Sequence, residues 1–248
     1  MRHLDLFSGI GGFALAASWV WPDHQVIEFV EKDPYCQKIL KKHWPDVPIC
    51  GDIHDFKPKP ADLVTGGFPC QPFSVAGKQR GSDDDRYLWP AMLEVIRRSQ
   101  PTWVVGENVA GIVNMALDQV LADLEMEGYA CQSFIIPACA VDAPHRRDRV
   151  WIVAHSESER TGRPGDSSGK GTCTHAGSMR LQERDRLRPR KHEADAATQA
   201  PVRWPTEPAV CRVAHGIPNR VHRLRALGNA IVPQVAKQIF ITLKESRV

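Results

Sequence analysis

The sequence predicts an α/β protein built around a doubly wound, mostly parallel β-sheet. Over the first 155 residues, short apolar runs alternate with segments whose apolar residues recur at helical spacing. Strands and helices that alternate in this way favour a parallel sheet with helices on both faces. The length of 248 residues, with 42% hydrophobic and 25% charged residues, is that of one large globular domain, alone or with a small appendage.

The predicted elements follow one another from the N-terminus. An apolar run at residues 3–7 leads into a glycine turn at residues 9–12, and Asp33 is placed to cap the helix after the second strand. The predicted strands cover residues 3–7, 25–31, 62–65, 102–106, 131–137 and 149–154, and the predicted helices cover 13–19, 34–43, 87–98, 115–127 and 232–244. Ligands of such sheets bind outside the carboxyl ends of the strands, so we expect the site in the loops that follow them.

The character of the sequence changes after His155. Residues 156–200 are rich in Ser, Gly, Thr, Arg, Glu and Asp and have almost no periodic apolar pattern, which is typical of a solvated loop. Regular structure is expected again from Trp204. Near the end of the chain, an apolar stripe at helical spacing is expected to face the core. Its residues are Ile231, Val235, Ile239 and Leu243.

Composition argues against several classes of protein. No stretch approaches the roughly 18 uninterrupted apolar residues of a membrane span, and the N-terminus has no signal-peptide core, so we expect a cytoplasmic protein with no membrane partner. The seven cysteines are scattered and form no Cys-x-x-Cys pair, which argues against a disulfide framework or a structural zinc site. The net charge of +3 is too small to indicate a nucleic-acid partner by itself.

The tightest cluster of chemical information is the loop of residues 66–74, Gly-Gly-Phe-Pro-Cys-Gln-Pro-Phe-Ser. A strand that ends in two glycines and is followed by two prolines cannot continue or enter a helix, so Cys70 is held in an irregular, presented conformation. A thiol held in this way is a candidate nucleophile. A small buried apolar residue is the alternative interpretation of any cysteine.

Two further features favour an adenosine-containing cofactor. The turn after the first strand carries Gly9 and Gly11, and glycines there let backbone amides approach a ligand, although such a turn also serves tight packing. The second strand ends in Glu31, where α/β folds commonly place an acid on a ribose diol. Farther along the chain, Asp52 and Ile53 are placed to hold an adenine edge.

Charged residues also accompany two later strands. Glu107 ends an apolar run and is either a capping or surface carboxylate or, beside the Cys70 loop, an acid with a shifted pKa. If a strand begins at Arg149, its alternation places Arg147 on the same side. Two guanidinium groups facing the pocket would lower a thiol pKa and bind an anion, whereas two facing solvent would have no special role.

The order of these blocks resembles the DNA (cytosine-5) methyltransferase family, in its small phage or bacterial form. The match covers residues 1–155 and about 215–245. Five blocks carry it: the S-adenosylmethionine loop Asp-Leu-Phe-Ser-Gly-Ile-Gly-Gly (5–12), the nucleophile motif Pro-Cys-Gln (69–71), Glu-Asn-Val (107–109), His-Arg-Arg-Asp-Arg (145–149) in place of Gln-x-Arg-x-Arg, and the closing Gly-Asn-Ala-Ile-Val (228–232).

The resemblance implies a Rossmann-like, S-adenosylmethionine-dependent methyltransferase fold in three parts. These would be a catalytic domain at 1–155, a short target-recognition region at 156–215, and a hinge with a C-terminal helix at 216–248 that returns to the catalytic domain. The cofactor would be S-adenosylmethionine, with no metal, since the methyl donor already carries the electrophilic charge. The cofactor residues implied are Phe7, Ile10, Gly11, Glu31, Asp52, Ile53, Pro69, Leu88, Asn229 and Ile231.

The resemblance also implies a mechanism. Cys70 would add to C6 of a cytosine flipped out of the duplex, which makes C5 a carbon that accepts the methyl group. Glu107 would engage N3 and the exocyclic amine. Arg149 would hold O2, and Arg147 would lie near Cys70. The loop of residues 73–86 would close over the flipped base.

Two departures from the family pattern affect DNA contacts more than chemistry. The family's glutamine is replaced by His145, which we expect to alter loop support. The region between the arginine motif and the closing block is short and weakly apolar, so we expect a compact reader that folds partly on DNA. Its basic residues are candidates for phosphate or guanine contacts. They are Arg180, Arg184, Arg186, Arg188, Arg190 and Lys191.

These features predict a monomeric DNA (cytosine-5)-methyltransferase. Its expected partner is double-stranded DNA, and its small size is compatible with a restriction-modification system that includes a cognate restriction endonuclease. The nearest alternative is a transfer-RNA cytosine-5 methyltransferase, which would prefer stem-loop RNA to duplex DNA. A catalytically silent DNA-binding protein has no need for Cys70, Glu107 and both arginines. An oxidoreductase leaves the Pro-Cys-Gln block unexplained.

Overall fold

The computed structural model describes residues 1–69, 87–156 and 220–246, all of which belong to one compact unit. Several predicted features lie outside these residues: Cys70, the loop of residues 73–86, and the recognition region from residue 157 onward with its six basic residues. The predicted domain boundaries therefore remain predictions. Within the described ranges, no helix combines the length and apolar character needed to cross a membrane.

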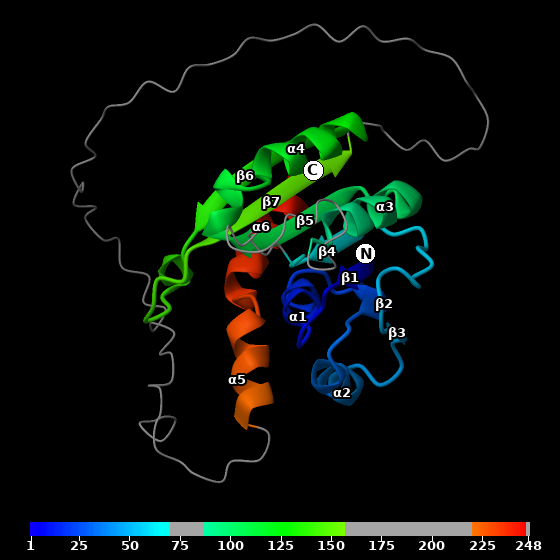
Figure 1. Ribbon diagram of the computed structural model, residues 1–248, viewed down its shortest axis with the longest axis vertical. Helices are drawn as coiled ribbons and strands as arrows, with labels where there is room; N and C mark the ends of the chain where they lie inside the picture. The colour runs from blue at the N-terminus through cyan, green and yellow to red at the C-terminus, as the bar shows by residue number, and fades with distance from the viewer. Residues whose placement is uncertain (70–86, 157–219, 247–248) are drawn as a thin grey trace, which may run out of the picture. The chain divides into compact units, whose positions relative to one another are not determined.

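A seven-stranded sheet forms the centre of the unit, in the order β3-β2-β1-β4-β5-β7-β6 (Figure 1). All neighbouring strands are parallel except β7, which is antiparallel to both β5 and β6. The predicted mostly parallel, doubly wound sheet is confirmed. The strands are β1 Arg2–Leu6, β2 Gln25–Val30, β3 Ile49–Cys50, β4 Leu63–Gly66, β5 Trp103–Val109, β6 Tyr129–Ile136 and β7 Arg149–Ser156.

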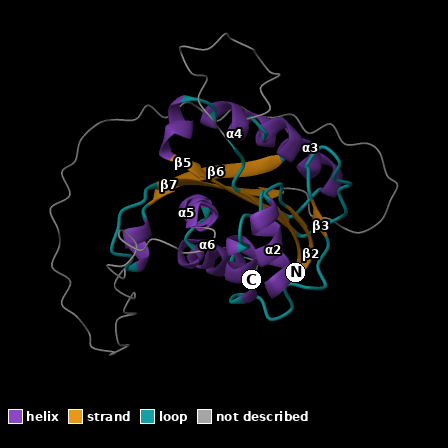
Figure 2. Cartoon of the chain, turned by 60° about the horizontal axis from the view of Figure 1, so that its bottom comes forward, coloured by secondary structure: helices purple, strands orange, loops and turns teal. Residues whose placement is uncertain are grey.

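Helices cover both faces of this sheet. Figure 2 shows α3 and α4 on one face and α6 on the other. The side chain of Asp33 accepts hydrogen bonds from the backbone N–H of Tyr35 (2.7 Å) and Cys36 (3.4 Å), which confirms the predicted cap of α2. The helices are α1 Gly12–Ser18, α2 Pro34–His43, α3 Trp89–Ser99, α4 Leu117–Met126, α5 Arg220–Asn229 and α6 Pro233–Glu245, with single-turn helices η1 Ala110–Asn114 and η2 Ala138–Val141.

Two apolar layers hold the helices on the sheet. On one face, side chains of α3 and α4 such as Met92 and Leu124 are fully buried against the central strands. On the other face, α6 returns to pack beside α1, where Phe13 meets the buried ring of Trp151 edge-on with ring centroids 6.0 Å apart. The apolar stripe of the last helix faces this second layer, as predicted. Its buried members are Val235, Ile239 and Leu243.

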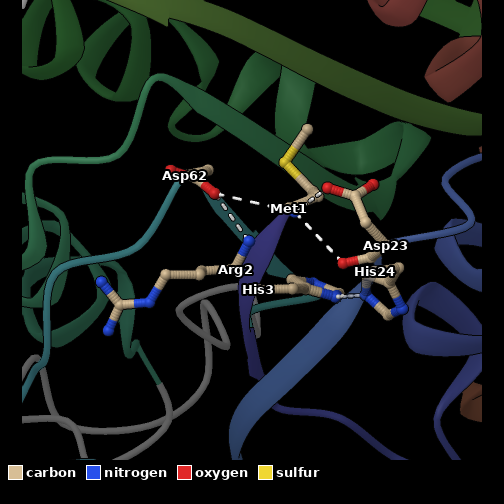
Figure 3. A network of polar contacts seen from close by, with 6 residues as sticks. All are labelled: Met1, Arg2, His3, Asp23, His24 and Asp62. Atoms are coloured by element: carbon tan, nitrogen blue, oxygen red, sulfur yellow. Dashed lines mark hydrogen bonds and ion pairs between the residues drawn. The ribbon is translucent and has the colours of Figure 1, made fainter.

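A polar network closes the amino end of β1 (Figure 3). The Met1 ammonium group lies 2.8 Å from a carboxylate oxygen of Asp23, and Asp62 accepts the backbone N–H of Arg2. One ring nitrogen of His3 is 2.9 Å from His24, and the other is 2.7 Å from the Thr65 hydroxyl. Because the hydroxyl donates in turn to Asp5 (3.0 Å), the network runs from the surface into the core.

Candidate functional site

A cavity of about 610 Å³ opens at the carboxyl ends of the parallel strands. Its lining includes residues from the segments after β1, β2 and β4, from β5 and β7, and from α5. This is the edge at which doubly wound sheets bind ligands. The predicted site residues that line it are Phe7, Glu31, Pro69, Leu88, Glu107, Arg149 and Asn229.

The glycine turn between β1 and α1 combines open space with tight packing. Gly9 lines the cavity with a positive φ of 55°, and an added Cβ there would meet no atom within 4 Å. Gly11 has a φ of 84°, and a Cβ there would lie 2.6 Å from the ring of Trp44. The turn therefore needs glycine at both positions, at Gly9 beside the cavity and at Gly11 for packing against the end of α2.

Glu31 organises the loops around the cavity. One of its carboxylate oxygens accepts the N–H of Gly9 and the other accepts the N–H of Asp33, each at 2.7 Å. Burial raises the pKa of this carboxyl group, and the two backbone hydrogen bonds oppose that rise. Each oxygen has a second acceptor position, so Glu31 retains the capacity to accept hydrogen bonds from a ligand's hydroxyl groups.

The other predicted cofactor residues lie beside the cavity wall rather than in it. Asp52 forms an ion pair with Lys32 (3.5 Å), which does line the cavity, and Ile53 is buried in the core. Ile231 packs on α1, where a Cβ added to Gly12 would lie 2.7 Å from its side chain. Ile10 is half-buried and does not line the cavity.

A buried ion pair lies at the cavity between β5 and β7. The Nε atom of Arg149 lies 2.9 Å from Oε1 of Glu107. Burial raises the pKa of Glu107 to about 7, even though Arg149 and Arg147 both act to lower it. Glu107 is therefore a carboxyl group that changes protonation near neutral pH, next to a fixed cation.

Two hydrogen bonds hold the chain at the two ends of the segment of residues 70–86, which carries Cys70. The amide of Asn108 donates to the carbonyl of Phe68 (2.9 Å), and the N–H of Leu88 donates to the carbonyl of Pro69 (3.4 Å). Pro69, the last described residue before Cys70, lines the cavity together with Leu88. The segment that carries the predicted nucleophile thus leaves from the cavity wall and returns to it.

Strand alternation does not determine where Arg147 lies, and its predicted position near Cys70 stays a prediction because Cys70 is outside the described residues. The strand begins at Arg149, but Arg147 lies outside it with a φ of 41°, so strand alternation does not extend back to it. Its Nη2 donates to the carbonyls of Gly228 and Ala230, both at 2.7 Å, and Arg147 is not part of the cavity lining. The two guanidinium groups thus have different partners.

Comparison with known proteins identifies the family. The chain matches the C-5 cytosine-specific DNA methylase family over residues 1–194. It belongs to that family. Type II methyltransferase M.AquIA from Picosynechococcus sp. is 31% identical over an alignment of 249 residues. The alignment covers 89% of this chain and 97% of that protein. Type II methyltransferase M.HgiCII from Herpetosiphon aurantiacus is 35% identical over 161 residues, 61% of this chain and 36% of that protein.

Solved structures support the fold of this chain. A DNMT2 mutant from Spodoptera frugiperda superposes with a TM-score of 0.56 at 21% identity, over 67% of this chain and 53% of that one. A putative DNA modification methyltransferase encoded within an Escherichia coli prophage gives a TM-score of 0.52 at 23% identity, over 63% of this chain and 47% of that one. The chain spans little more than a third of the length of its Herpetosiphon relatives.

Several residues that line the cavity were absent from the predicted site. Asp33 was identified only as a helix cap, and Gly9 only as part of the turn. The sequence did carry a signal for these two, because both follow predicted strands. No strand pattern pointed to the residues that α5 contributes, since α5 itself was not predicted. Arg225 and Ala226 carried no signal, whereas Gly228 and the predicted Asn229 belong to the closing block of residues 228–232.

Proposed function

We propose that this chain is an S-adenosylmethionine-dependent methyltransferase that methylates C5 of cytosine in double-stranded DNA. Family membership supports the reaction class, and one observation carries the proposal. Glu107 lies buried at the cavity against Arg149, with its pKa raised to about 7. Such a carboxyl group keeps a proton much closer to neutral pH than an ordinary glutamate does, so it is able to donate one to N3 of cytosine.

The residues around the cavity fit S-adenosylmethionine. The volume of the cavity lies in the range of small-molecule sites. Glu31 keeps the capacity to accept hydrogen bonds from a ribose diol. Phe7 and Leu88 offer apolar contacts, and Asn229 offers an amide. When bound, S-adenosylmethionine supplies a methyl group on a cationic sulfur atom. We assign supporting roles in the wall to the five predicted cofactor residues that do not line the cavity: Ile10, Gly11, Asp52, Ile53 and Ile231.

Residues of the chain then form the covalent bond to the base and transfer its protons. The Cys70 thiolate forms a bond to C6, and the displaced electron pair reaches N3, which takes the proton of Glu107. Arg149 stabilises the resulting Glu107 carboxylate and binds O2 of the base. After the methyl group reaches C5, a water molecule takes up the C5 proton. The bond between Cys70 and C6 then breaks, which regenerates the thiolate and restores the ring. N3 then returns its proton to Glu107.

Different regions of the chain would carry out catalysis and target recognition. We assign residues 1–155 to catalysis, residues 156–215 to reading the target sequence, and residues 216–248 to a hinge and returning helix. The base must be flipped out, because C5 and C6 are not accessible to both thiol and cofactor within the stacked duplex. A cytoplasmic monomer that works beside a cognate restriction endonuclease matches the Type II names of its relatives.

A covalent trap tests this function. Duplex DNA with 5-fluorocytosine in many sequence contexts is incubated with S-adenosylmethionine and the full chain. Fluorine at C5 blocks the elimination step, so wild type should form an adduct that survives denaturation. Cys70→Ser should form none, and Cys139→Ser, which alters an exposed thiol outside the cavity, should still form it. An adduct on transfer RNA alone would reassign the substrate, and no adduct on either would refute the chemistry.

A further inference from the structure

Helix α5 forms one wall of the cavity but is poorly anchored by apolar contacts. Its residues Arg225, Ala226, Gly228 and Asn229 line the cavity. Among its described side chains, those of residues 221–229, Ala226 is the buried one, and all the others are exposed. A ten-residue helix is marginal in water unless tertiary contacts hold it. Hydrophobic burial is therefore too small to fix this wall, and polar contacts must contribute.

Besides the stacked rings of Tyr35 and His222, whose centroids lie 5.8 Å apart, α5 is held by a polar contact from Arg147. Its Nη2 donates to the carbonyls of Gly228 and Ala230, both at 2.7 Å, across more than 80 positions of the sequence. Gly228 lies in the last turn of α5, where carbonyl groups have no partner within the helix. A cation at this end also complements the helix dipole. One guanidinium group thus caps α5 and holds the residue on each side of Asn229.

The neighbouring segments show that this contact has a defined geometry. Arg147 adopts a left-handed backbone conformation with a φ of 41°, which a non-glycine residue keeps only when its surroundings impose it. On the other side of the same segment, Ile231 packs against Gly12 at the start of α1. Asn229 therefore lies between two fixed points, one made by Arg147 and the other by α1.

We propose that Arg147 is a positioning residue that clamps the end of α5 and so holds Asn229 and Arg225 in the wall of the cofactor cavity. It acts through the backbone carbonyls of Gly228 and Ala230 rather than by touching the ligand. This role rests on the proposed function insofar as the cavity binds S-adenosylmethionine. The clamp itself rests on the two hydrogen bonds alone.

The test uses the full chain without DNA. We would measure S-adenosylhomocysteine binding by calorimetry and hydrogen exchange in peptides covering residues 226–231. Arg147→Ala should weaken binding by roughly tenfold or more, because the fraction of molecules with a formed wall falls. It should also speed exchange in these peptides. Arg147→Lys, which can donate to both carbonyls, should restore most of both signals.

A matched control lies next to the clamp in the sequence. Arg146 is exposed and pairs locally with Asp148 (3.0 Å), so Arg146→Ala should change neither binding nor exchange. If Arg147→Ala does not fold, Arg147→Gln keeps part of the stem but not the charge or the reach, and should show the same losses. Wild-type exchange and affinity in the loss variants would overturn the clamp. If wild type bound no S-adenosylhomocysteine, the proposed function would fail, and exchange alone would decide on the clamp.

Discussion

The guanidinium group of Arg149 and the carboxyl group of Glu107 meet diagonally across two antiparallel strands, with 2.9 Å between Nε and Oε1. Arg149 pairs in register with Val109, two residues beyond Glu107, so both side chains share one face of the sheet. Burial outweighs this ion pair, because the pKa of Glu107 rises to about 7. The pair therefore keeps a proton available near neutral pH in a fixed position.

Replacing the acid should remove proton donation while leaving the cavity intact. Glu107→Gln keeps the shape of the side chain but carries no acidic proton, so we expect methyl transfer to slow by about 10²- to 10⁴-fold. Binding of S-adenosylhomocysteine should change little. Single-turnover methylation of duplex DNA, with calorimetry for binding, would measure both. A rate close to that of wild type would show that Glu107 does not donate the proton.

The pH profile should report the same residue. Since the protonated form of Glu107 is the donor, the rate contribution of this group should fall as pH rises through about 7. Arg149 lowers this pKa, so Arg149→Met should move the fall to higher pH in addition to reducing the rate. Single-turnover rates from pH 6 to 9 would locate the fall. The profile of Arg146→Ala should match wild type, and an unshifted profile for Arg149→Met would contradict the coupling.

Much of the fold could be predicted because the central parallel strands β4 and β5 are buried on both faces. Such strands appear as short continuous apolar runs, as at residues 62–65 and 102–106, and Asp33 marks a helix start through its side-chain chemistry. The direction of β7 could not be obtained this way, because apolar runs carry no orientation. Residues 137–148 link β6 to β7 with only η2 between them, which suits an antiparallel return.

The missed helix α5 has a different cause. Its side chains are exposed almost throughout, so the sequence has no apolar period to reveal it. Its position depends on Arg147, more than 80 residues away, and no local pattern contains that contact. The same contact explains why Arg147 does not line the cavity, although strand alternation predicted that it would face the same side as Arg149. Sequence patterns therefore predicted the lining residues best at the ends of strands and least well in the C-terminal segment that completes the cavity.

Packing of that segment against α1 can be tested independently of catalysis. A Cβ at position 12 would lie 2.7 Å from Cγ1 of Ile231, so Gly12→Ala should destabilise the protein by about 1–3 kcal/mol. Combined with Ile231→Ala, it should cost less than the sum of the single changes, by about 1 kcal/mol. Urea unfolding would measure this cycle. Gly51→Ala is the control, since its nearest neighbour would be an ordinary 3.6 Å away; strictly additive effects would refute the contact.

Beyond the residues drawn in Figure 3, the polar network continues from His3 through Thr65 to the carboxyl group of Asp5, which the proposed chemistry does not use. Asp5 is fully buried, and its Oδ2 has no hydrogen-bond partner among the described residues. Burial raises its pKa to about 8 despite hydrogen bonds from Thr65 and from the backbone of Ala14, with nearby Glu31 adding to the rise. Two histidines of the network have the opposite shift. Burial lowers the pKa of His3, and burial with the Met1 ammonium group lowers that of His24 to about 4.

Stability should therefore depend on pH in a way that Asp5→Asn removes. The folded protein keeps the Asp5 proton that the unfolded chain releases above about pH 4, so this stabilisation is complete below pH 4 and is lost as pH rises to about 8. The loss is on the order of 5 kcal/mol. The histidines act in the opposite direction below about pH 6.5 but are present in both proteins, so they largely cancel in the difference between wild type and Asp5→Asn. Urea unfolding from pH 4.5 to 9 would measure that difference, with exposed Asp55→Asn as control. A difference that stayed constant with pH would mean that Asp5 is ionised in the fold.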